Sequence, residues 1–450
     1  ARDNGLKVEW AEPEGSRESS EALRTRLREA ASKPGTVVRE SGAPPASPEG
    51  RRVEGSYDVG FQPHAAMEPL NCTAHARRDA CDIWAAAQVP GWARGEAARA
   101  LGLPPDSVRI HPTLVGGSFG RCLNPDFVVE AALVSRAVGA PVKLVFSRED
   151  DIQHDFYRPA SLHRLMADLD SDGWPVTWTH RIASTSLAAW LDPKTPRPQE
   201  SEVGGAVDLP YGIPFVRIEY AHVDSPVPRG WWRSVEHTPN AFAIECFLDE
   251  LAAAGGKDPL ALRLRLLDSP PEPPRSAGSR ERLQGVLRLA AEKAGWGLPL
   301  PARSGRGIAC HYSFGTYVAQ VAEAAVDKDG NVTVKRVVCA VDCGQAVNPD
   351  GIAAQLEGSV AFGLTAALKA GVVVENGRVS QSNFHNYEPL HMGEMPQVEV
   401  HLVRSSEPPG GMGEPGVPPV APALCNALYA ATGVRIRQLP VRTRLLRQRG

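Results

Sequence analysis

One carboxylate lies in a loop whose composition favours a fixed position. Glu414 belongs to the segment 410–419, which reads Gly-Gly-Met-Gly-Glu-Pro-Gly-Val-Pro-Pro. Glycines let a backbone approach a ligand closely, and prolines stiffen the chain. Residues 420–433 are expected to form a helix, with Pro422 in its first turn and Gly433 at its end. A general base needs such positioning, so Glu414 is a candidate base, and a solvated loop glutamate is the alternative.

A glycine-rich turn is the second candidate site. Residues 116–120, Gly-Gly-Ser-Phe-Gly, connect an expected strand at 108–115 with an expected helix that starts near Pro125. Backbone N–H groups at such a turn can bind an anion or a cofactor. The spacing differs from the dinucleotide-binding fingerprint, which excludes that class of site. A tight turn without a ligand is the alternative.

Polar groups elsewhere could complete a site. Gln88 ends an expected strand and offers a neutral amide donor, which can stabilise an oxygen atom without adding charge. Arg233 and Ser234 follow a tryptophan pair, and their charge and backbone amides suit phosphates. Gln355 lies on an expected helix at 353–369. The alternatives are a glutamine that caps a strand end and surface arginines beside the tryptophans.

Together these segments resemble the molybdopterin-binding catalytic subunits of the xanthine dehydrogenase/aldehyde oxidase family. They are most similar to the branch that contains the large (beta) subunit of isoquinoline 1-oxidoreductase and the bacterial membrane-associated aldehyde dehydrogenases. The matching segments are spread along most of the chain, at 64–71, 85–90, 116–120, 227–234, 341–358 and 410–419. The resemblance implies an α+β fold of molybdenum-cofactor-binding domains, with mixed sheets, hairpins and packed helices.

The resemblance also implies a role for each candidate residue. Glu414 would be the catalytic base beside molybdenum, and Gln88 would hydrogen-bond the apical oxygen ligand of the metal. The backbone of the glycine-rich turn would pass over the molybdenum centre, and other residues would contact the pterin. The residues implied for cofactor binding are Gly117, Phe119, Gly120, Arg233, Ser234 and Gln355. No side chain of this chain is expected to ligate a metal.

The implied activity is that of a molybdenum hydroxylase. The cofactor would be molybdopterin with molybdenum, in the cytosine dinucleotide form, and the substrate would be an aldehyde or an N-heteroaromatic compound oxidised with water-derived oxygen. Electrons would pass to a separate small 2Fe-2S subunit. The family implies the bacterial periplasm or the periplasmic face of the membrane, with the cytoplasm as the alternative. A non-catalytic scaffold or assembly paralogue of the same fold is the second hypothesis.

Two departures from the family pattern bear on these expectations. Xanthine-type enzymes carry a second acidic residue shortly after the glycine-rich turn, whereas residues 121–123 here are Arg-Cys-Leu. An apolar Leu123 cannot orient a purine, so xanthine is a poor substrate for this chain. The Met-Gly-Gln-Gly segment that helps to hold the pterin is also missing. An N-terminal segment or a companion chain is therefore expected to complete the cofactor site.

Composition limits the other function classes. The 450 residues contain 49 Lys plus Arg and 52 Asp plus Glu, for a net charge of −3, so no basic excess indicates nucleic acid. The best apolar stretch, 351–374, is interrupted by Glu357 and Lys369, so no transmembrane segment is expected. The eight cysteines are scattered without a Cys-x-x-Cys pair. They are expected to be buried small hydrophobes, and no iron–sulfur cluster is expected in this chain.

Other polar residues have plainer interpretations. Glu68 is expected to cap backbone in a bend. His385, Glu388 and His391 have loosely metal-like spacing, but Pro389 breaks any helix that would align them, so no metal site is expected. The expected helix at 240–254 carries Glu245, Asp249 and Glu250. These acids are expected to form a solvated face of the helix rather than a site.

The order of expected elements suggests three regions. Residues 1–55 resemble the remnant of a small α+β hammerhead-like domain plus a linker, with a strand at 6–10 and a helix at 21–31. Residues 56–270 would form the first part of the cofactor-binding domain, and residues 271–450 the second part with the Glu414 loop. Hairpins are expected at three dipeptides flanked by strand-like runs. These are Asp172-Gly173, Asp329-Gly330 and Asn376-Gly377.

Overall fold

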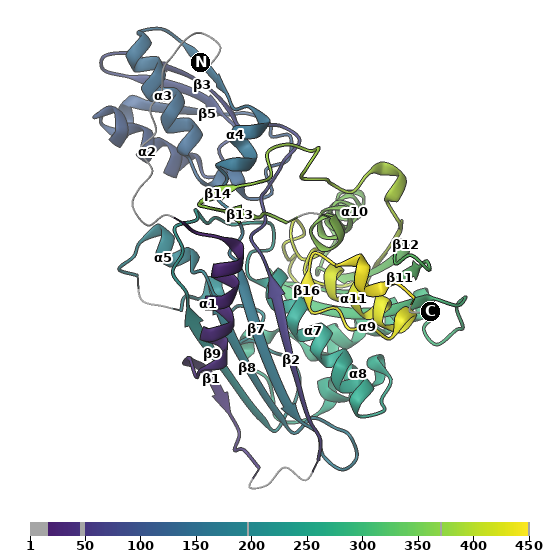
Figure 1. Cartoon of the computed structure of the whole chain (residues 1–450). Helices are drawn as coiled ribbons and strands as arrows, with labels where there is room; N and C mark the ends of the chain where they lie inside the picture. Colours follow the sequence, from purple (N-terminus) through teal and green to yellow (C-terminus); the bar gives the residue numbers. More distant parts are fainter. Residues whose placement is uncertain (1–16, 46–49, 196–197, 370, 449–450) are drawn as a thin grey trace.

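A mixed six-stranded sheet forms one layer of the molecule (Figure 1). The structure is a computed structural model that describes residues 17–45, 50–195, 198–369 and 371–448. The strands in spatial order are β1 (Thr36–Ser41), β9 (Phe215–His222), β8 (Thr177–Ser184), β7 (Ser161–Asp168), β2 (Arg52–Val59) and β16 (Gln438–Leu439). β8 runs parallel to β9 and β2 runs parallel to β16, whereas the other neighbours are antiparallel.

Two four-stranded sheets and a short hairpin complete the strands. The first contains β10 (Ser304–Ser313), β11 (Thr316–Val326), β12 (Val332–Asp342) and β15 (Gln397–Leu402), in this order. The second contains β5 (Val108–Pro112), β4 (Cys81–Ala85), β3 (Asn71–Ala76) and β6 (Val142–Val145), in this order. The hairpin pairs β13 (Val374–Glu375) with β14 (Arg378–Val379). Both larger sheets mix parallel and antiparallel neighbours, so the expected α+β class with mixed sheets is confirmed.

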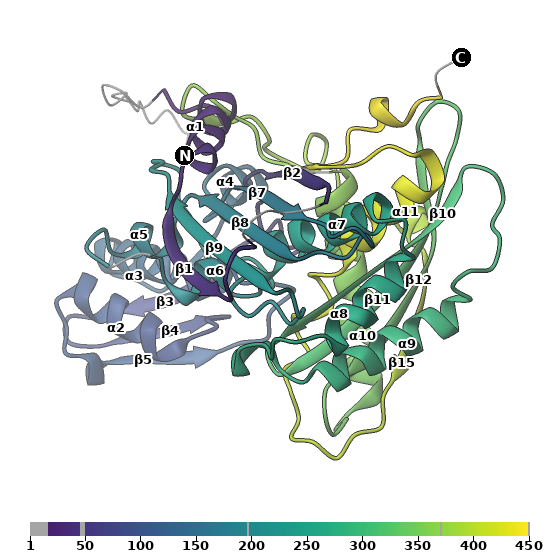
Figure 2. The ribbon, with the colours of Figure 1, turned by 90° about the horizontal axis from the view of Figure 1, so that it is seen from below.

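Helices cover the sheets and join two of them. The helices are α1 (Ser20–Ser32), α2 (Pro90–Leu101), α3 (Asp126–Val138), α4 (Arg148–Gln153), α5 (Leu187–Leu191), α6 (Glu200–Val203), α7 (His237–Ala254), α8 (Pro259–Asp268), α9 (Arg280–Ala294), α10 (Pro349–Leu364) and α11 (Val420–Thr432). α7 packs against β2 and β7 on one side and against β10 and α11 on the other (Figure 2). Nearly all of its side chains are therefore buried. α11 packs on β10, where Gly305 and Gly307 leave no room for a side chain.

The three expected hairpins are confirmed, and their turns explain why. β7 and β8 pair around Asp172-Gly173, β11 and β12 pair around Asp329-Gly330, and the small hairpin turns at Asn376-Gly377. Each glycine has a positive φ, between 74° and 88°. Only glycine adopts this region without strain, so a two-residue turn signal in the sequence specifies the pairing of its flanking strands.

The expected divisions at residues 55 and 270 do not coincide with breaks in the packing. The first falls within β2, and β1 pairs with β9 in the six-stranded sheet, to which α1 also packs. One hydrophobic core then extends from Tyr57 to Leu446 across the second division. A separate core lies between the sheet β5-β4-β3-β6, called the small sheet below, and the helices α2 and α3. The strand expected at 6–10 lies outside the described residues.

The acids of α7 are buried, so the interpretation of a solvated face was wrong. Glu245, Asp249 and Glu250 are each less than a tenth exposed. Glu245 pairs with Arg263 at 2.8 Å, and Asp249 pairs with Arg435 at 2.5 Å. Glu250 pairs with Arg437 and accepts a hydrogen bond from Tyr57 at 2.6 Å. The basic partners come from distant segments, which is why the local sequence gave no sign of them.

One helical segment has the length and composition of a membrane span. It comprises residues 349–369, that is α10 and the π-helical turn after it. Its Leu356, Val360 and Leu364 are completely buried in the large core. Packing against other elements therefore accounts for the apolar stripe that the sequence shows on this helix.

Candidate functional site

The Glu414 loop is anchored to the ends of three strands. The backbone N–H of Gly410 donates to the Cys343 carbonyl at 2.8 Å, and that of Gly411 donates to the Phe314 carbonyl at 2.8 Å. The Thr316 hydroxyl donates to the Gly411 carbonyl at 2.7 Å. The chain then enters α11, whose last turn ends at Gly433 in the left-handed conformation, as expected. The loop before Glu414 is thus held by backbone contacts on both of its sides.

Ser234 holds the carboxylate of Glu414. The Ser234 backbone N–H donates to Glu414 Oε1 at 2.9 Å, and the Ser234 hydroxyl donates to the Glu414 carbonyl at 2.6 Å. Ser234 and Val235 have φ angles of 71° and 47°, a strained region for side chains larger than glycine. Such strain persists only where the surroundings enforce it, and it concentrates at functional sites. Glu414 itself is half-buried, and no described residue hydrogen-bonds to its Oε2.

Arg233 ties the same loop to α10. Its Nε donates to the Gly413 carbonyl at 2.7 Å. Its Nη2 donates to the side-chain and backbone oxygens of Gln355 at 2.9 and 3.2 Å. Burial lowers the pKa of the Arg233 guanidinium to about 10, and the nearby Glu414 opposes this shift. The described contacts of Arg233 therefore position the loop and Gln355.

The glycine-rich turn approaches this group through aromatic contacts. Phe119 has a φ of 55°, and its ring lies 4.4 Å from that of Phe362 on α10. The ring of Phe362 also stacks on that of Trp232, at 4.4 Å. Gly120 has a φ of 110°, and an added Cβ would lie 1.7 Å from the Trp231 carbonyl oxygen. Only glycine therefore allows the turn to lie against the segment that carries Arg233 and Ser234.

Gln88 and Glu68 flank the turn. The Gln88 backbone N–H donates to the Cys122 carbonyl at 3.1 Å, and the residue is exposed. The Glu68 carboxylate accepts hydrogen bonds from the Gly116 backbone N–H and, at 2.9 Å, from the Asn71 side chain. The expectation that Glu68 caps backbone is thus confirmed. Gly117 is next to this contact, with a φ of 81°.

Contacts therefore link every candidate residue in one continuous group. The Gln88 backbone N–H donates to Cys122, two residues after the glycine-rich turn. The turn contacts the segment 231–234, and that segment contacts both the Glu414 loop and Gln355. These segments come from the small sheet, from the entry to α7, from α10 and from the entry to α11. Among the described residues, seven non-glycine residues have a positive φ, and four of them belong to the group or bond to it: Phe119, Ser234, Val235 and Phe314. The arrangement can hold a proton acceptor at a fixed point beside a cradle of backbone N–H groups.

Sequence reasoning missed the aromatic and histidine neighbours of this group. Phe362 and Phe314 contact it from elements that carry no local motif, so no signal was available. His237 lies 5.3 Å from the ring of Phe314 and 2.9 Å from His311 Nε2. Burial lowers the pKa of His237 to about 4, so this pair is neutral at pH 7. Arg121, which follows the turn, pairs with Asp126 and Asp155 and is buried.

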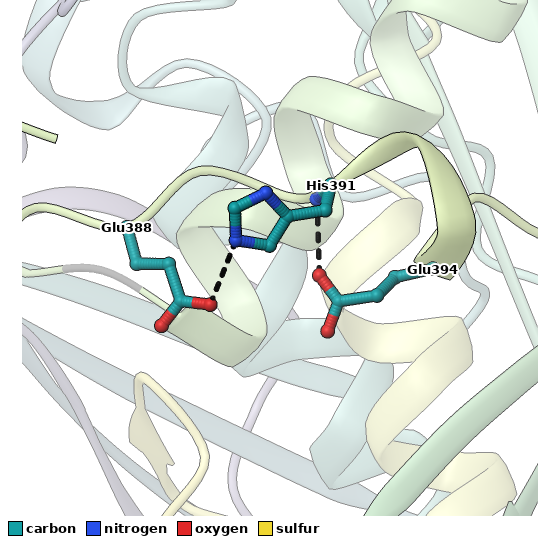
Figure 3. A group of neighbouring side chains, drawn as sticks. All are labelled: Glu388, His391 and Glu394. Atoms are coloured by element: carbon teal, nitrogen blue, oxygen red, sulfur yellow. Dashed lines mark hydrogen bonds and ion pairs between the residues drawn. The ribbon is translucent and has the colours of Figure 1, made fainter. Parts of the chain in front are cut away.

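The residues with metal-like spacing at 385–391 do not all lie together in the structure. Glu388, His391 and Glu394 lie together at the surface, without His385 (Figure 3). His391 Nε2 lies 3.0 Å from Glu388 Oε1, and His391 N–H donates to Glu394 at 3.0 Å. Lys369 Nζ lies 3.1 Å from Glu388 and 2.5 Å from Glu394. A lysine therefore already supplies the cation between these carboxylates.

The cysteines are buried thiols, as expected. All eight are free and buried. Cys339 lies in β12 and Cys343 directly follows that strand, so each packs in the core between sheet and helices. Burial raises the pKa of the Cys339 thiol to about 12.

Known proteins resemble this chain over most of its length. A model described as a molybdopterin cofactor-binding domain matches residues 35–267, and a second with the same description matches residues 289–396. A membrane-bound aldehyde dehydrogenase (pyrroloquinoline-quinone) of Gluconacetobacter polyoxogenes is 33% identical over 98% of this chain and 60% of its own length. Isoquinoline 1-oxidoreductase subunit beta of Brevundimonas diminuta is 34% identical over 85% of this chain and 49% of its own length.

A solved structure has the same fold. The structure of quinoline 2-oxidoreductase from Pseudomonas putida 86 covers 92% of this chain, with a TM-score of 0.78 and 15% identity; 79% of that chain is covered. The present chain spans about half to three fifths of the length of the two curated relatives, at 49% and 60%.

Proposed function

Because this chain belongs to the molybdopterin-binding subunits of the xanthine dehydrogenase family, we propose that it is the catalytic part of a molybdenum hydroxylase. Its substrate would be an aldehyde or an N-heteroaromatic compound, oxidised with oxygen from water. The observation that carries this proposal is the hydrogen bonding of the Glu414 carboxylate. One carboxylate oxygen is fixed by the Ser234 N–H at 2.9 Å, and the other accepts no hydrogen bond from any described residue.

The residues of the site fit the cofactor. The glycine-rich turn offers backbone N–H groups around Gly117, Phe119 and Gly120, beside a segment whose strained backbone is held by its neighbours. An added Cβ at Gly413 would meet open space, so the chain before Glu414 leaves room for a bound group. Gln88 presents an exposed neutral amide on the side of the turn. We propose that these residues, with Arg233, Ser234 and Gln355, hold molybdopterin.

The proposed mechanism assigns the proton transfer to the chain. When bound, the molybdenum cofactor supplies the redox chemistry, and the protein supplies positioning and electrostatics. Glu414 Oε2 would take the proton from the water that supplies the oxygen, which makes that oxygen nucleophilic. The hydrogen bond from the Ser234 N–H to Oε1 keeps the carboxylate in one orientation. Gln88 would offer its neutral side-chain amide as a hydrogen-bond donor to the bound cofactor without adding charge. The aromatic side chains of Phe119, Phe362 and Trp232 would border the bound group on this side.

Further features of the activity follow from the same family. We propose the cytosine dinucleotide form of molybdopterin, a small 2Fe-2S subunit as the electron acceptor, and the bacterial periplasm or the periplasmic face of the membrane. The name of the relative from G. polyoxogenes supports a membrane location. That name also carries pyrroloquinoline quinone, so the cofactor of this chain needs a direct chemical assay. A scaffold paralogue without cofactor is the second hypothesis, and the same assay distinguishes it.

Replacement of the base tests the proposal. Glu414→Gln keeps the shape of the side chain and its contact with Ser234 but removes the proton acceptor. With benzaldehyde or isoquinoline as substrate and a dye as electron acceptor, turnover of the natively purified complex should fall by about 10²–10⁴-fold. Molybdenum content should stay at the wild-type level.

The exposed Glu407, seven residues before Glu414, offers the matched control. Glu407→Gln should leave turnover unchanged. Near-normal turnover of Glu414→Gln with unchanged molybdenum content would refute the assignment of the base.

A further inference from the structure

A cavity lies away from the Glu414 loop, between α1 and the strand β16. Its volume is about 400 Å³. Its walls come from α1, from the end of β2, from the segment after α10 and from residues 438–442. Cavities of this size hold small organic ligands in other proteins. None of the residues assigned to the Glu414 site lines it.

A buried arginine lines this cavity without a carboxylate partner. Arg158 is only 3% exposed, and its Nη2 donates to the Gly60 carbonyl at 3.2 Å. The Nε of Arg158 has no hydrogen-bond partner among the described residues. The guanidinium lies 4.9 Å from the centre of the Trp232 ring. Burial lowers the pKa of Arg158 to about 10, so the group is charged at pH 7.

The other cations of the cavity wall differ in whether a carboxylate pairs with them. Arg24 is paired with Asp58 at 2.7 Å, and Lys369 is paired with Glu388 and Glu394. Arg442 is exposed, and it shares the Asp58 carboxylate electrostatically with Arg24 and Arg28. Among the described residues of the wall, Arg158 therefore lacks a carboxylate partner, and Arg442 has only a share of Asp58. A buried charge without a partner is costly, so an anion in this cavity would be strongly favoured.

The remaining wall is apolar on one side. Leu23 and Leu27 of α1 face Phe61 and Val372, and these four side chains belong to one hydrophobic cluster. A ligand that fills the cavity would thus contact cations at one part and aliphatic or aromatic groups at another. Such a wall suits an anion with an apolar body better than an inorganic ion alone.

We propose that this cavity binds a small organic anion whose carboxylate or phosphate group pairs with Arg158 and whose apolar body packs on α1. Arg442 contributes to the attraction from the mouth of the cavity. The ring of Trp232 lies between Arg158 and Phe362, so the ligand would be one aromatic layer away from the Glu414 site. The proposal does not depend on the reaction assigned to Glu414.

Calorimetric titration of the full chain in its native complex tests this site. The probes are 4-phenylbutyrate for a carboxylate, phenyl phosphate and inorganic phosphate for a phosphate, and 4-phenylbutanamide as the neutral control. The variants are Arg158→Met and Arg442→Gln. Arg444→Gln is the matched control, because Arg444 is exposed two residues further on and does not line the cavity.

The site predicts one molecule of an organic anion per chain and no comparable binding of the amide. Arg158→Met should weaken binding about tenfold or more, the loss expected for a charge-assisted hydrogen bond. Arg442→Gln should weaken it about threefold, since an exposed charge contributes less. Tighter binding of phenyl phosphate than of 4-phenylbutyrate would assign the head group as phosphate, and the reverse order would assign it as carboxylate.

The opposite results would overturn the proposal. These are the absence of binding by both organic anions, equal binding of the amide, or binding that Arg158→Met and Arg442→Gln leave unchanged. If Arg158→Met fails to fold, Arg442→Gln and the comparison with the amide decide, because Arg442 is at the surface. Binding of inorganic phosphate alone, without either organic anion, would also refute a site with an apolar part.

Discussion

The two oxygens of the Glu414 carboxylate have different surroundings. Ser234 donates to Oε1 through a backbone N–H that is itself fixed in a strained conformation. Arg233, one residue earlier, donates to the carbonyl of Gly413, the residue before Glu414. Two neighbouring residues thus hold the side chain of the base and the backbone that carries it. This argues that small displacements of the segment 233–234 would move the base.

A conservative change at Arg233 tests this positioning role. Arg233→Lys keeps the charge but cannot donate to both Gly413 and Gln355, because an ammonium group lacks the planar fork of a guanidinium. We expect kcat to fall about 10- to 100-fold, the effect of misplacing a reacting group by a fraction of an ångström to an ångström. Molybdenum content should be retained.

The exposed Arg288 on α9 is the control, and Arg288→Lys should leave kcat unchanged. Complete loss of molybdenum from Arg233→Lys would show instead that Arg233 binds the cofactor directly.

At the scale of elements, the site depends on a close approach between the turn 116–120 and the segment 231–234. Gly120 allows it, since any side chain there would overlap the Trp231 carbonyl. His64 supports the same carbonyl, with Nε2 at 2.9 Å, and is held in turn by Asp155. The small sheet and the large core therefore meet through backbone contacts at the site.

Gly120→Ala should separate these two segments. The methyl group would require a φ of 110° from alanine and would lie 1.7 Å from the Trp231 carbonyl oxygen. Strain at such a position alone costs about 1–3 kcal/mol, and the overlap adds to it. We expect a lower melting temperature and loss of bound pterin.

Gly91→Ala on α2 is the control, because an added Cβ there meets nothing within 4 Å. A normal melting temperature and full pterin content in Gly120→Ala would show that the turn does not form part of the site.

Two buried histidines in the six-stranded sheet predict a pH dependence of stability. His163 Nδ1 lies 3.0 Å from His180 Nε2, and both side chains are completely buried. Burial lowers the pKa of His163 to about 3 from the ordinary 6.5, and burial also lowers that of His180. Between pH 3 and pH 6.5 the unfolded chain therefore binds more protons than the folded chain. The free energy of unfolding should therefore be at its full value above pH 6.5 and should decrease as the pH falls towards 3.

Replacement of His163 isolates its share of this effect. His163→Gln removes one titrating group, so the slope of stability against pH between 6 and 4 should decrease by up to about 1.4 kcal/mol per pH unit. Urea unfolding at several pH values measures the slope. His385→Gln, at an exposed position, should leave it unchanged. Equal slopes for His163→Gln and wild type would show that His163 is protonated in the folded state.

Local sequence signals predicted hairpins and helix ends. Strand pairing and the burial of charged residues depend on contacts between distant segments. The hairpins at Asp172-Gly173 and Asp329-Gly330 follow from turn chemistry, and Gly139 and Gly433 end their helices in the left-handed conformation as expected. The pairing of β1 with β9 could not be predicted, because these strands are separated by more than 170 residues and no motif connects them. The burial of Glu245 was missed for the same reason, since its partner Arg263 lies on another helix.

The sequence named the candidate site residues, but it did not indicate the contacts between them. Glu414, Gln88 and the turn at 116–120 were identified through their resemblance to a family. Their residue types alone left the plainer alternatives open. The contact between Ser234 and Glu414 joins residues 180 positions apart. Only the fold brings a donor from the entry to α7 to the carboxylate, so no local pattern could indicate it.

At the scale of the whole molecule, the chain corresponds to part of its longer relatives. It spans 60% of the aldehyde dehydrogenase and 49% of the isoquinoline oxidoreductase subunit. The sequence also lacks the Met-Gly-Gln-Gly segment of the family. We propose that further polypeptide, as an N-terminal segment or a companion chain, supplies the remaining contacts to the pterin.

The chain purified on its own should therefore bind molybdopterin poorly. On this proposal, the residues of this chain would supply only part of the contacts to the pterin, and the further polypeptide would supply the rest. Molybdenum and pterin per chain should be well below one in this preparation. A stable monomer with full cofactor occupancy would show that residues 1–450 complete the site by themselves.

The most direct test of the central claim is the cofactor content of the native complex. Metal analysis by mass spectrometry and fluorescence of the oxidised pterin should give about one molybdenum and one molybdopterin per chain, with no pyrroloquinoline quinone. This result is predicted because the family is defined by molybdopterin binding and the converging loops fit that group. A native, active complex that contains pyrroloquinoline quinone, or that contains neither molybdenum nor pterin, would contradict the account.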